Sequence, residues 1–235
     1  MPLILPLADG RALEIKVRTS TRARHLRLVS GLGGIEAVVP PGYDEGRLAK
    51  FVESKKSWIA RTARHYEKIR ERTGGHEEGS LYFLGDRYRY HVIKDRLPSA
   101  TISEGMKTVT FHVTDKRSYR RHIKEWYKEQ TRITIAERLP AIAARMGLQY
   151  NRVTIRSQRS RWASCSKKRN LNFNLLLSAA PVEVIDYVIV HELAHILEMD
   201  HSKRFWDIVA SADPGFEKHR QWLEDHSQVI RVESL

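Results

Sequence analysis

The sequence predicts an α+β fold, in which a β-rich N-terminal region is followed by a mainly helical C-terminal region with a small sheet. Short segments of alternating apolar and polar residues occupy the first forty positions, and this period of two is that of a strand. Apolar residues recur with helical spacing over 118–146. Near residue 170 a second alternating segment precedes a long apolar segment with helical spacing. We place the boundary between the two regions at residues 115 and 116.

The N-terminal region, residues 1–115, is expected to contain strands and one long helix. The helix extends over Asp44–Arg72, where apolar residues recur at steps of three, four and seven, and Asp44 is its N-cap. Glycines at 31–34 suggest a hairpin connection, and the glycine-rich segment Thr73–Ser80 is a flexible break. The expected strands are Arg11–Arg18, Arg24–Val29, Gly34–Val39, Leu81–Ile93 and Thr108–Val113.

The C-terminal region, residues 116–235, begins with an expected helix over Ser118–Met146. Pro140 must kink or divide this helix, because it lacks an amide donor and its ring clashes with the preceding turn. Two strands are expected next, at Tyr150–Arg156 and Asn170–Leu177. In the second strand asparagines alternate with apolar residues, a pattern that fits a half-buried or edge strand.

An apolar helix is expected from Val182 to Glu198, with Pro181 well placed at its start. Its residues are apolar on nearly every side, and such a helix belongs in the interior of a protein. The chain then has to turn at Met199-Asp200 before another helix over Ser202–Ala210. Asp200 is expected either to adopt an unusual backbone conformation or to cap that helix.

The composition is that of a globular protein without a membrane span. Hydrophobic residues make up 41% and charged residues 29% of the chain, and no apolar run approaches the roughly 20 residues that span a bilayer. The apolar start of the chain is short and lacks the features of a signal peptide. The single cysteine, Cys165, cannot form an internal disulfide and is expected to be a buried, inert thiol. Together these observations predict a cytoplasmic protein.

The basic charge is unevenly distributed, and the formal net charge is +13. Residues 1–150 contain 29 Lys and Arg against 17 Asp and Glu, and residues 151–235 contain 12 against 11. Within the second part, Arg152–Arg169 carries seven basic residues and no acidic one. Such a surface could attract nucleic acid, a phosphate, an anionic membrane or an acidic substrate. A merely solvated basic surface is the other interpretation, since no recognition helix, RNP-type strand or cysteine finger accompanies the charge.

The apolar helix contains the motif H-E-x-x-H at residues 191–195. Residues four apart on a helix lie on one face, one turn above the other, so His191 and His195 can converge on one ion. Zinc binds imidazole nitrogen and prefers tetrahedral coordination, so a third ligand is required. His201, six residues after His195, is in position to supply it once the helix has ended. We therefore predict one Zn2+ per chain on these three histidines.

Three neutral histidines leave a fourth zinc position for water. A bound zinc lowers the pKa of its water to about 7, and Glu192 lies where it can take the water's proton and pass it to a leaving amine. The sequence therefore predicts a zinc-dependent hydrolase, in the first place a peptidase, with Glu192 as catalytic base. Structural pairing of the histidines with carboxylates in a core is the alternative interpretation.

Several motifs of the second region together resemble those of a known family. They are R-W-A-S-C at 161–165, N-L-N at 170–172, V-I-D-Y-V-I-V-H-E-L-A-H at 184–195, H-S at 201–202 and F-W at 205–206. In these motifs the chain resembles the YgjP-like metallopeptidase family, which is related to SprT-like and other minimal zincins. The resemblance covers roughly residues 21–226. The family usually has glycine where this chain has Ala163.

The resemblance implies that residues 116–235 form a zincin-like catalytic region, with the three histidines as metal ligands and Glu192 as base. It also implies that the strand Asn170–Leu177 lines the cleft, where it would hold an extended peptide by main-chain pairing. Arginines that follow the preceding strand could hold a substrate carboxylate, a phosphate or an oxyanion. The candidate substrate-binding residues are Asn172, Asn174, Arg156, Arg159 and Arg161.

Two alternative functions stay open. One is a metal-dependent phosphohydrolase acting on nucleotides, similar to a nucleoside triphosphate pyrophosphatase, although no P-loop supports it. The other is a nucleic-acid-associated protein, either a protease or one whose zinc is only structural. His219 could reach the site as an electrophile, and Asp186, Asp207 or Glu217 could orient a ligand histidine.

Overall fold

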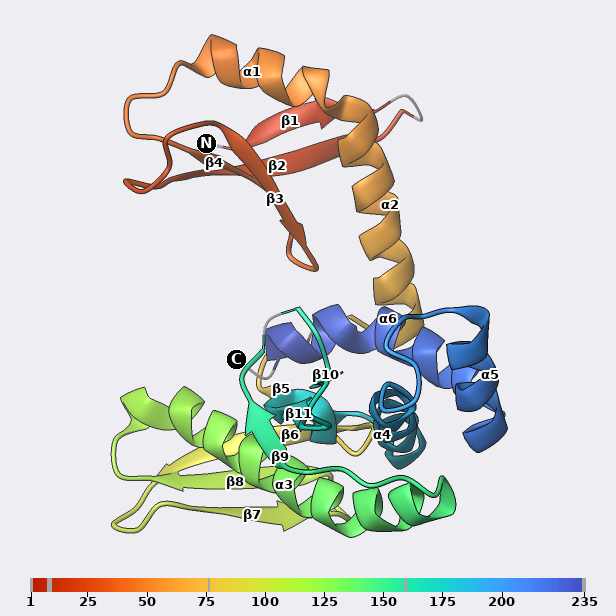
Figure 1. Ribbon diagram of the computed structural model, residues 1–235. Coiled ribbons are helices and arrows are strands. Elements are labelled where there is room, and N and C mark those ends of the chain that lie inside the picture. Colours follow the sequence, from red (N-terminus) through yellow and green to blue (C-terminus); the bar gives the residue numbers. More distant parts are fainter. Residues whose placement is uncertain (1, 8–9, 76, 159, 234–235) are drawn as a thin grey trace. The chain divides into compact units, whose positions relative to one another are not determined.

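The computed structural model describes residues 2–7, 10–75, 77–158 and 160–233. Its helices and strands form an α+β structure (Figure 1), which confirms the predicted fold class. The internal contacts divide the chain into two compact units, Met1–His76 and Glu77–Leu235.

The N-terminal unit contains a four-stranded mixed sheet. Its strands are β1 (Leu3–Pro6), β2 (Ala12–Thr19), β3 (Arg27–Gly31) and β4 (Gly34–Val39), in the order β1-β2-β4-β3. Strands β2 and β4 are parallel, and the other neighbours are antiparallel. Gly31 pairs with Gly34, which confirms the predicted hairpin connection between β3 and β4.

Two helices of this unit, α1 (Glu45–Ser54) and α2 (Lys56–Thr73), stand where the sequence predicted one. Asp44 is the N-cap of α1, as predicted, and its side chain accepts the amide of Arg47 at 2.6 Å. The prediction of a single helix is wrong because the chain departs from helical geometry at Lys55, with φ −106° and ψ 7°. Both helices and the sheet share one apolar core, whose members include Ile15, Val39, Leu48, Val52 and Ile59.

The C-terminal unit begins with a second four-stranded sheet. Its strands are β5 (Ser80–Phe83), β6 (Asp86–Lys94), β7 (Ser99–Ser103) and β8 (Thr108–Val113), in the order β5-β6-β8-β7. The predicted single strand Leu81–Ile93 is wrong, because a turn at Leu84 and Gly85, with φ of 48° and 90°, folds it into a hairpin. The sequence did not predict β7, which has few apolar residues.

Helix α3 (Tyr119–Arg145) follows a 3-10 turn at Lys116–Ser118 and packs against this second sheet. The ring centroid of Trp126 lies 5.6 Å from that of Phe111 on β8. Because β5–β8 share a core with α3, the compact units divide at residues 76 and 77, ahead of the boundary placed at residues 115 and 116. Pro140 lies within α3 and does not divide it.

A three-stranded sheet follows α3. Its strands are β9 (Val153–Arg156), β10 (Ala163–Cys165) and β11 (Leu171–Asn174), in the order β10-β11-β9. Strand β11 is the middle strand, parallel to β9 and antiparallel to β10. Of the two alternatives for Asn170–Leu177, a half-buried or an edge strand, the edge strand is therefore wrong. The strand ends at Asn174, where a 3-10 helix, Leu175–Ala179, begins.

Three helices complete the unit: α4 (Val182–Ala194), α5 (Lys203–Ala212) and α6 (Phe216–Glu233). Helix α4 is buried on nearly every side, as predicted, and packs in one core with Phe173 of β11 and Phe205 of α5. It ends at Ala194, four residues before its predicted end at Glu198. Among the described residues, no helix has the length and apolar character needed to cross a membrane. The cytoplasmic location stays a prediction.

Candidate metal centre

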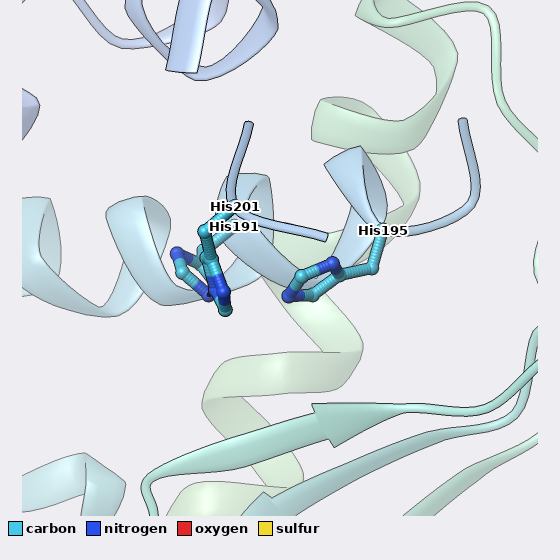
Figure 2. Close-up of side chains that lie close together, drawn as sticks. All are labelled: His191, His195 and His201. Carbon is cyan, nitrogen blue, oxygen red and sulfur yellow. Dashed lines mark hydrogen bonds between the residues drawn. The ribbon is translucent and has the colours of Figure 1, made fainter. Parts of the chain in front are cut away.

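The three histidines of the predicted metal site come together at the C-terminal end of α4 (Figure 2). His191 is in the last turn of α4, and His195 directly follows the helix. The chain then turns and brings His201 back against the end of α4. Ser202 is the N-cap of α5. Asp200 does not cap that helix itself, and its side chain accepts the amide of Ser202 at 2.9 Å.

The imidazole nitrogens are close enough to share one ion. One possible ligand nitrogen from each histidine lies within 4.8 Å of the other two. Nε2 of His201 is 3.2 Å from Nε2 of His191, and two nitrogens on one tetrahedral zinc would be about 3.3 Å apart. The buried ring of Phe205 lies beside all three histidines, with centroid distances of 4.9, 4.5 and 4.8 Å to His191, His195 and His201. This ring excludes water from one side of the cluster.

A main-chain carbonyl sets the tautomer of His195. Its Nδ1 lies 3.0 Å from the carbonyl oxygen of Glu198. Because a carbonyl can only accept, Nδ1 carries the proton and Nε2 keeps a free lone pair. Metal-binding histidines commonly have such a partner on the nitrogen that does not face the metal. Nδ1 of His191 is buried and has no hydrogen-bond partner among the described residues.

Burial favours the neutral form of His191 and His195. It lowers the pKa of His191 to about 3, and repulsion from His195 and His201 acts in the same direction. Burial also lowers the pKa of His195, although the bond to Glu198 opposes this effect. Neutral imidazoles with free lone pairs are the form that binds zinc and similar ions. The spacing and the chemistry of these donors therefore fit a metal ion.

Glu192 lies beside the histidines and is only 5% exposed. The backbone N–H of Cys165 acts on its carboxylate and lowers its pKa. Its Oε2 has no hydrogen-bond partner among the described residues. Burial raises the pKa of this carboxyl to about 8, while the charge of Arg161 and the N–H of Cys165 oppose the rise. A carboxyl with one free oxygen, held in place beside a metal site, can accept a proton and return it.

A cleft of about 270 Å³ opens over the histidines and Glu192, and β10 forms one wall of it. The sequence did not predict β10, because no period can be recognised in a strand of three residues. The R-W-A-S-C motif was the available signal. Besides the histidines and Glu192, the lining residues are Arg161, Ala163, Ser164, Cys165 and Met199.

Among the candidate substrate-binding residues that the structure describes, Arg161 alone lines this cleft. Asn174 is only 2% exposed, and its own chain uses its hydrogen bonds. Its amide donates to the carbonyls of Gln158 at 2.8 Å and Arg161 at 2.9 Å. Its Oδ1 accepts the amide of Leu176 at 3.1 Å. These bonds fix the segment before β10 and give Asn174 a structural role.

The other candidates lie away from the cleft lining. Asn172 is half-buried and donates to the hydroxyl of Ser164 at 3.3 Å. Arg156 is exposed on β9, at the opposite edge of the sheet from β10. Arg159 lies outside the described residues. Since both edges of β11 are paired, the alternating face that the sequence shows there has no open edge toward a substrate.

The acidic residues predicted to orient a ligand histidine have other partners. Asp186 forms a bidentate ion pair with Arg138 of α3, and Asp207 pairs with Lys203 at 3.1 Å. For His195 the orienting group is the main-chain carbonyl of Glu198. A carbonyl contributed by any residue type leaves no signal in the sequence.

Three remaining candidates also lie outside the cluster of ligand atoms. Nδ1 of His219 lies 2.8 Å from a carboxylate oxygen of Asp213. Glu217 is in the first turn of α6. Cys165 is half-buried rather than buried, and burial raises the pKa of its thiol to about 11. At neutral pH this thiol is protonated, in keeping with the inert role expected for it.

A buried glutamate beside three converging histidines, at the end of an apolar helix, is the arrangement typical of metal-dependent hydrolases. The sequence profile of the YgjP-like family, described as a metallopeptidase domain, matches residues 24–226. The chain therefore belongs to the YgjP-like metallopeptidase family, as its motifs indicated, and membership implies a metal ion.

One solved structure is also similar, the crystal structure of the metallopeptidase zymogen of Pyrococcus abyssi abylysin. It is 24% identical to this chain, with a TM-score of 0.35, and the match covers 42% of this chain and 93% of that chain. A search of curated proteins gave no significant match.

Proposed function

We propose that this protein is a zinc-dependent metallopeptidase that binds one zinc ion per chain through His191, His195 and His201. Glu192 is its catalytic base. The observation that carries the proposal is the pairing of three converging imidazoles with a buried carboxylate whose Oε2 has no hydrogen-bond partner among the described residues. Family membership supports the same chemistry.

The chemical role of each group at the site follows from what it can donate or accept. When bound, the metal would act as a Lewis acid and lower the pKa of a water molecule to about 7. Glu192 accepts a proton from the attacking water at Oε2 and returns it to the leaving amine nitrogen. The N–H of Cys165 lowers the pKa of this carboxyl and so favours its charged form. The carbonyl of Glu198 keeps Nε2 of His195 free of a proton.

In this proposal strand β10, rather than the strand Asn170–Leu177 that the family resemblance implied, pairs with the substrate. The carbonyl of Trp162 accepts the amide of Asn174, and the amide of Ser166 donates to the carbonyl of Asn170. Main-chain groups alternate in direction along a strand, so those of Ala163 and Cys165 point toward the open edge. The N–H of Cys165 acts on Glu192, and the N–H and carbonyl of Ala163 would pair with an extended substrate.

The test is the metal content of the purified protein beside that of a His195→Ala variant. About one zinc per chain in the wild type, lost in the variant, supports the ligand assignment. Stoichiometric zinc in the variant would overturn it. Glu192→Gln should keep the zinc and stop peptide hydrolysis, and undiminished turnover would remove Glu192 as base.

Hydrolysis of nucleotide phosphoesters stays an alternative prediction. Arg161 is the feature of the cleft lining that suits a phosphate, because a guanidinium binds phosphate oxygens in pairs. Assays of the zinc-loaded protein with unstructured peptides and with nucleoside triphosphates, side by side, separate the two reactions. Hydrolysis of nucleotides without hydrolysis of any peptide would mean that the protein is a phosphohydrolase and not a peptidase.

A further inference from the structure

We infer that the cleft selects acidic polypeptides and binds carboxylate side chains on both sides of the scissile bond. This inference rests on the proposed peptidase function and names its substrate class. It comes from the distribution of basic residues around β10. Arg161 precedes the strand, and Lys167, Lys168 and Arg169 follow it in the turn that leads to β11.

Arg161 presents its charge at one end of β10. Its side chain is exposed and lines the cleft, and no carboxylate among the described residues forms an ion pair with it. Its backbone is held in place, because its carbonyl accepts the amide of Asn174 at 2.9 Å. The guanidinium therefore extends from a fixed point beside the histidines and is available to a substrate carboxylate.

The turn between β10 and β11 presents the charges at the other end. Arg169 has φ of 58°, and its amide donates to the carbonyl of Ser166 at 2.7 Å. The amide of Asn170 donates to the hydroxyl of Ser166 at 3.1 Å, and Asn151 donates to the carbonyl of Lys168. These bonds fix the backbone of the turn, while its three basic side chains are exposed and form no ion pair with a described carboxylate.

The two basic ends lie just outside β10. The strand has three residues and spans about 10 Å, with Arg161 two residues before it and Lys167 two residues after it. An extended substrate that pairs with the open edge and continues past both ends of β10 would reach these basic residues. The histidines and Glu192 lie beside the strand between these ends. Carboxylates on both flanks of the cleaved bond would therefore meet basic partners.

The same features favour a polypeptide over a nucleic acid. The open edge of β10 offers main-chain groups that pair with another main chain. Binding of single-stranded nucleic acid relies on aromatic platforms for the bases. Apart from the imidazoles, no aromatic side chain is among the residues that line the cleft. The basic groups therefore act here as selectors of peptide side chains.

The experiment uses three fluorogenic peptides with one common central sequence and flanks of Glu, Gln or Lys. At low salt the zinc-loaded protein should prefer Glu over Gln flanks by about fivefold per flank, mainly through KM, because exposed ion pairs are weak. The preference should shrink at high salt. Equal KM for the Glu and Gln peptides would overturn the inference while leaving the peptidase proposal intact.

Two variants assign the preference to its sources. Arg161→Gln should remove the gain from one flank, and the double change Lys167→Gln with Lys168→Gln should reduce the gain from the other. Each variant is judged by the ratio of its KM values for the Glu and Gln peptides, so that a change common to both peptides, such as one caused by loss of the Arg161 charge near Glu192, cancels. Arg121 is an exposed arginine on α3 that does not line the cleft. Arg121→Gln removes the same charge as Arg161→Gln and should change the KM of neither peptide. An equal loss with Arg121→Gln would mean a general charge effect and overturn the inference.

Direct binding separates this inference from the peptidase proposal. Fluorescence anisotropy of the labelled Glu and Gln peptides with the Glu192→Gln variant measures the preference without turnover. Tighter binding of the Glu peptide supports the inference, and equal binding or no binding of either peptide overturns it. A single-stranded oligonucleotide serves as competitor. If it displaces the Glu peptide at lower concentration than unlabelled peptide does, the basic groups select nucleic acid and the inference is wrong.

Discussion

The two compact units differ in how they bury polar groups. Among the described residues of the N-terminal unit, Thr73 is the buried polar side chain, and its hydroxyl donates to the carbonyl of Ile69 at 2.8 Å. In the C-terminal unit, Oε2 of Glu192 and Nδ1 of His191 are buried without a hydrogen-bond partner within the part of the chain that the structure describes, and so are Nε2 of His122 and Oε1 of Gln158 away from the metal centre. An unpaired buried polar group costs free energy. The metal centre brings two such atoms together in one cleft, which makes it a place where this chain departs from the rules of a stable core.

The difference predicts where substitutions act. Changes in the N-terminal core should alter the free energy of unfolding and leave metal binding alone. Changes of the polar side chains at the metal centre should alter metal binding or turnover, at little cost or even with a gain in the stability of the metal-free chain.

The largest expected effect is that of His195→Ala. With one of three ligands removed, zinc affinity should fall by more than the about 10–100-fold typical of a lost outer-shell contact, and peptide hydrolysis should cease. His65→Ala removes an exposed histidine of the N-terminal unit and should change neither the zinc affinity nor peptide hydrolysis. Calorimetric titration of zinc into the metal-free proteins makes the measurement. Equal affinities of the two variants would remove the contrast between the units.

Glu192→Gln should separate catalysis from stability. Loss of a general base is expected to lower kcat by about 10²–10⁴-fold, while zinc stays bound. The metal-free variant should be at least as stable as the wild type, because a neutral amide is less costly to bury than a carboxylate. Urea unfolding and single-substrate kinetics test both halves, with the exposed Glu53→Gln of α1 as control. A clear loss of stability in Glu192→Gln would show that the buried carboxylate stabilises the fold.

Two substitutions that each leave a cavity compare the apolar cores of the two units. Ile59→Ala in the N-terminal core should lower the free energy of unfolding by about 2–5 kcal/mol and leave zinc affinity unchanged. Phe205→Ala should cost about 3–5 kcal/mol and also weaken zinc binding, because the ring contacts all three histidines. Unfolding followed by circular dichroism and zinc titration give the two quantities. A drop in zinc affinity for Ile59→Ala would mean that the two regions are coupled.

The sequence predicted what depends on local geometry. The H-E-x-x-H spacing places His191 and His195 on one helical face whatever surrounds the helix, and Asp44 caps α1 through an amide three residues away. The convergence of His201 followed from the need for a third ligand once the helix had ended.

What the sequence could not predict depends on pairing between distant segments. The alternation in Asn170–Leu177 is real, but its central position is decided by β9 and β10, and β10 is too short to show a period. The turn at Leu84-Gly85 is likewise set by its neighbours, since the amides of both residues donate to carbonyls at Ser178 and Ala179. Because β11 is paired on both sides, the open edge of this sheet beside the cleft is that of β10, which carries part of the R-W-A-S-C motif.

The two asparagines of β11 give the smallest expected effects. They test whether a buried polar side chain outside the metal centre stabilises the fold. Asn174 is buried but its hydrogen bonds are made, as they are for Thr73, so Asn174→Ala should cost about 1–3 kcal/mol of unfolding free energy. Asn172→Ala loses one 3.3 Å bond and should stay within about 0.5 kcal/mol. If both variants instead kept wild-type stability and raised KM equally, β11 would contact substrate after all. With the expected order, the alternating asparagines are an architectural pattern, and substrate contact belongs to the open edge of β10.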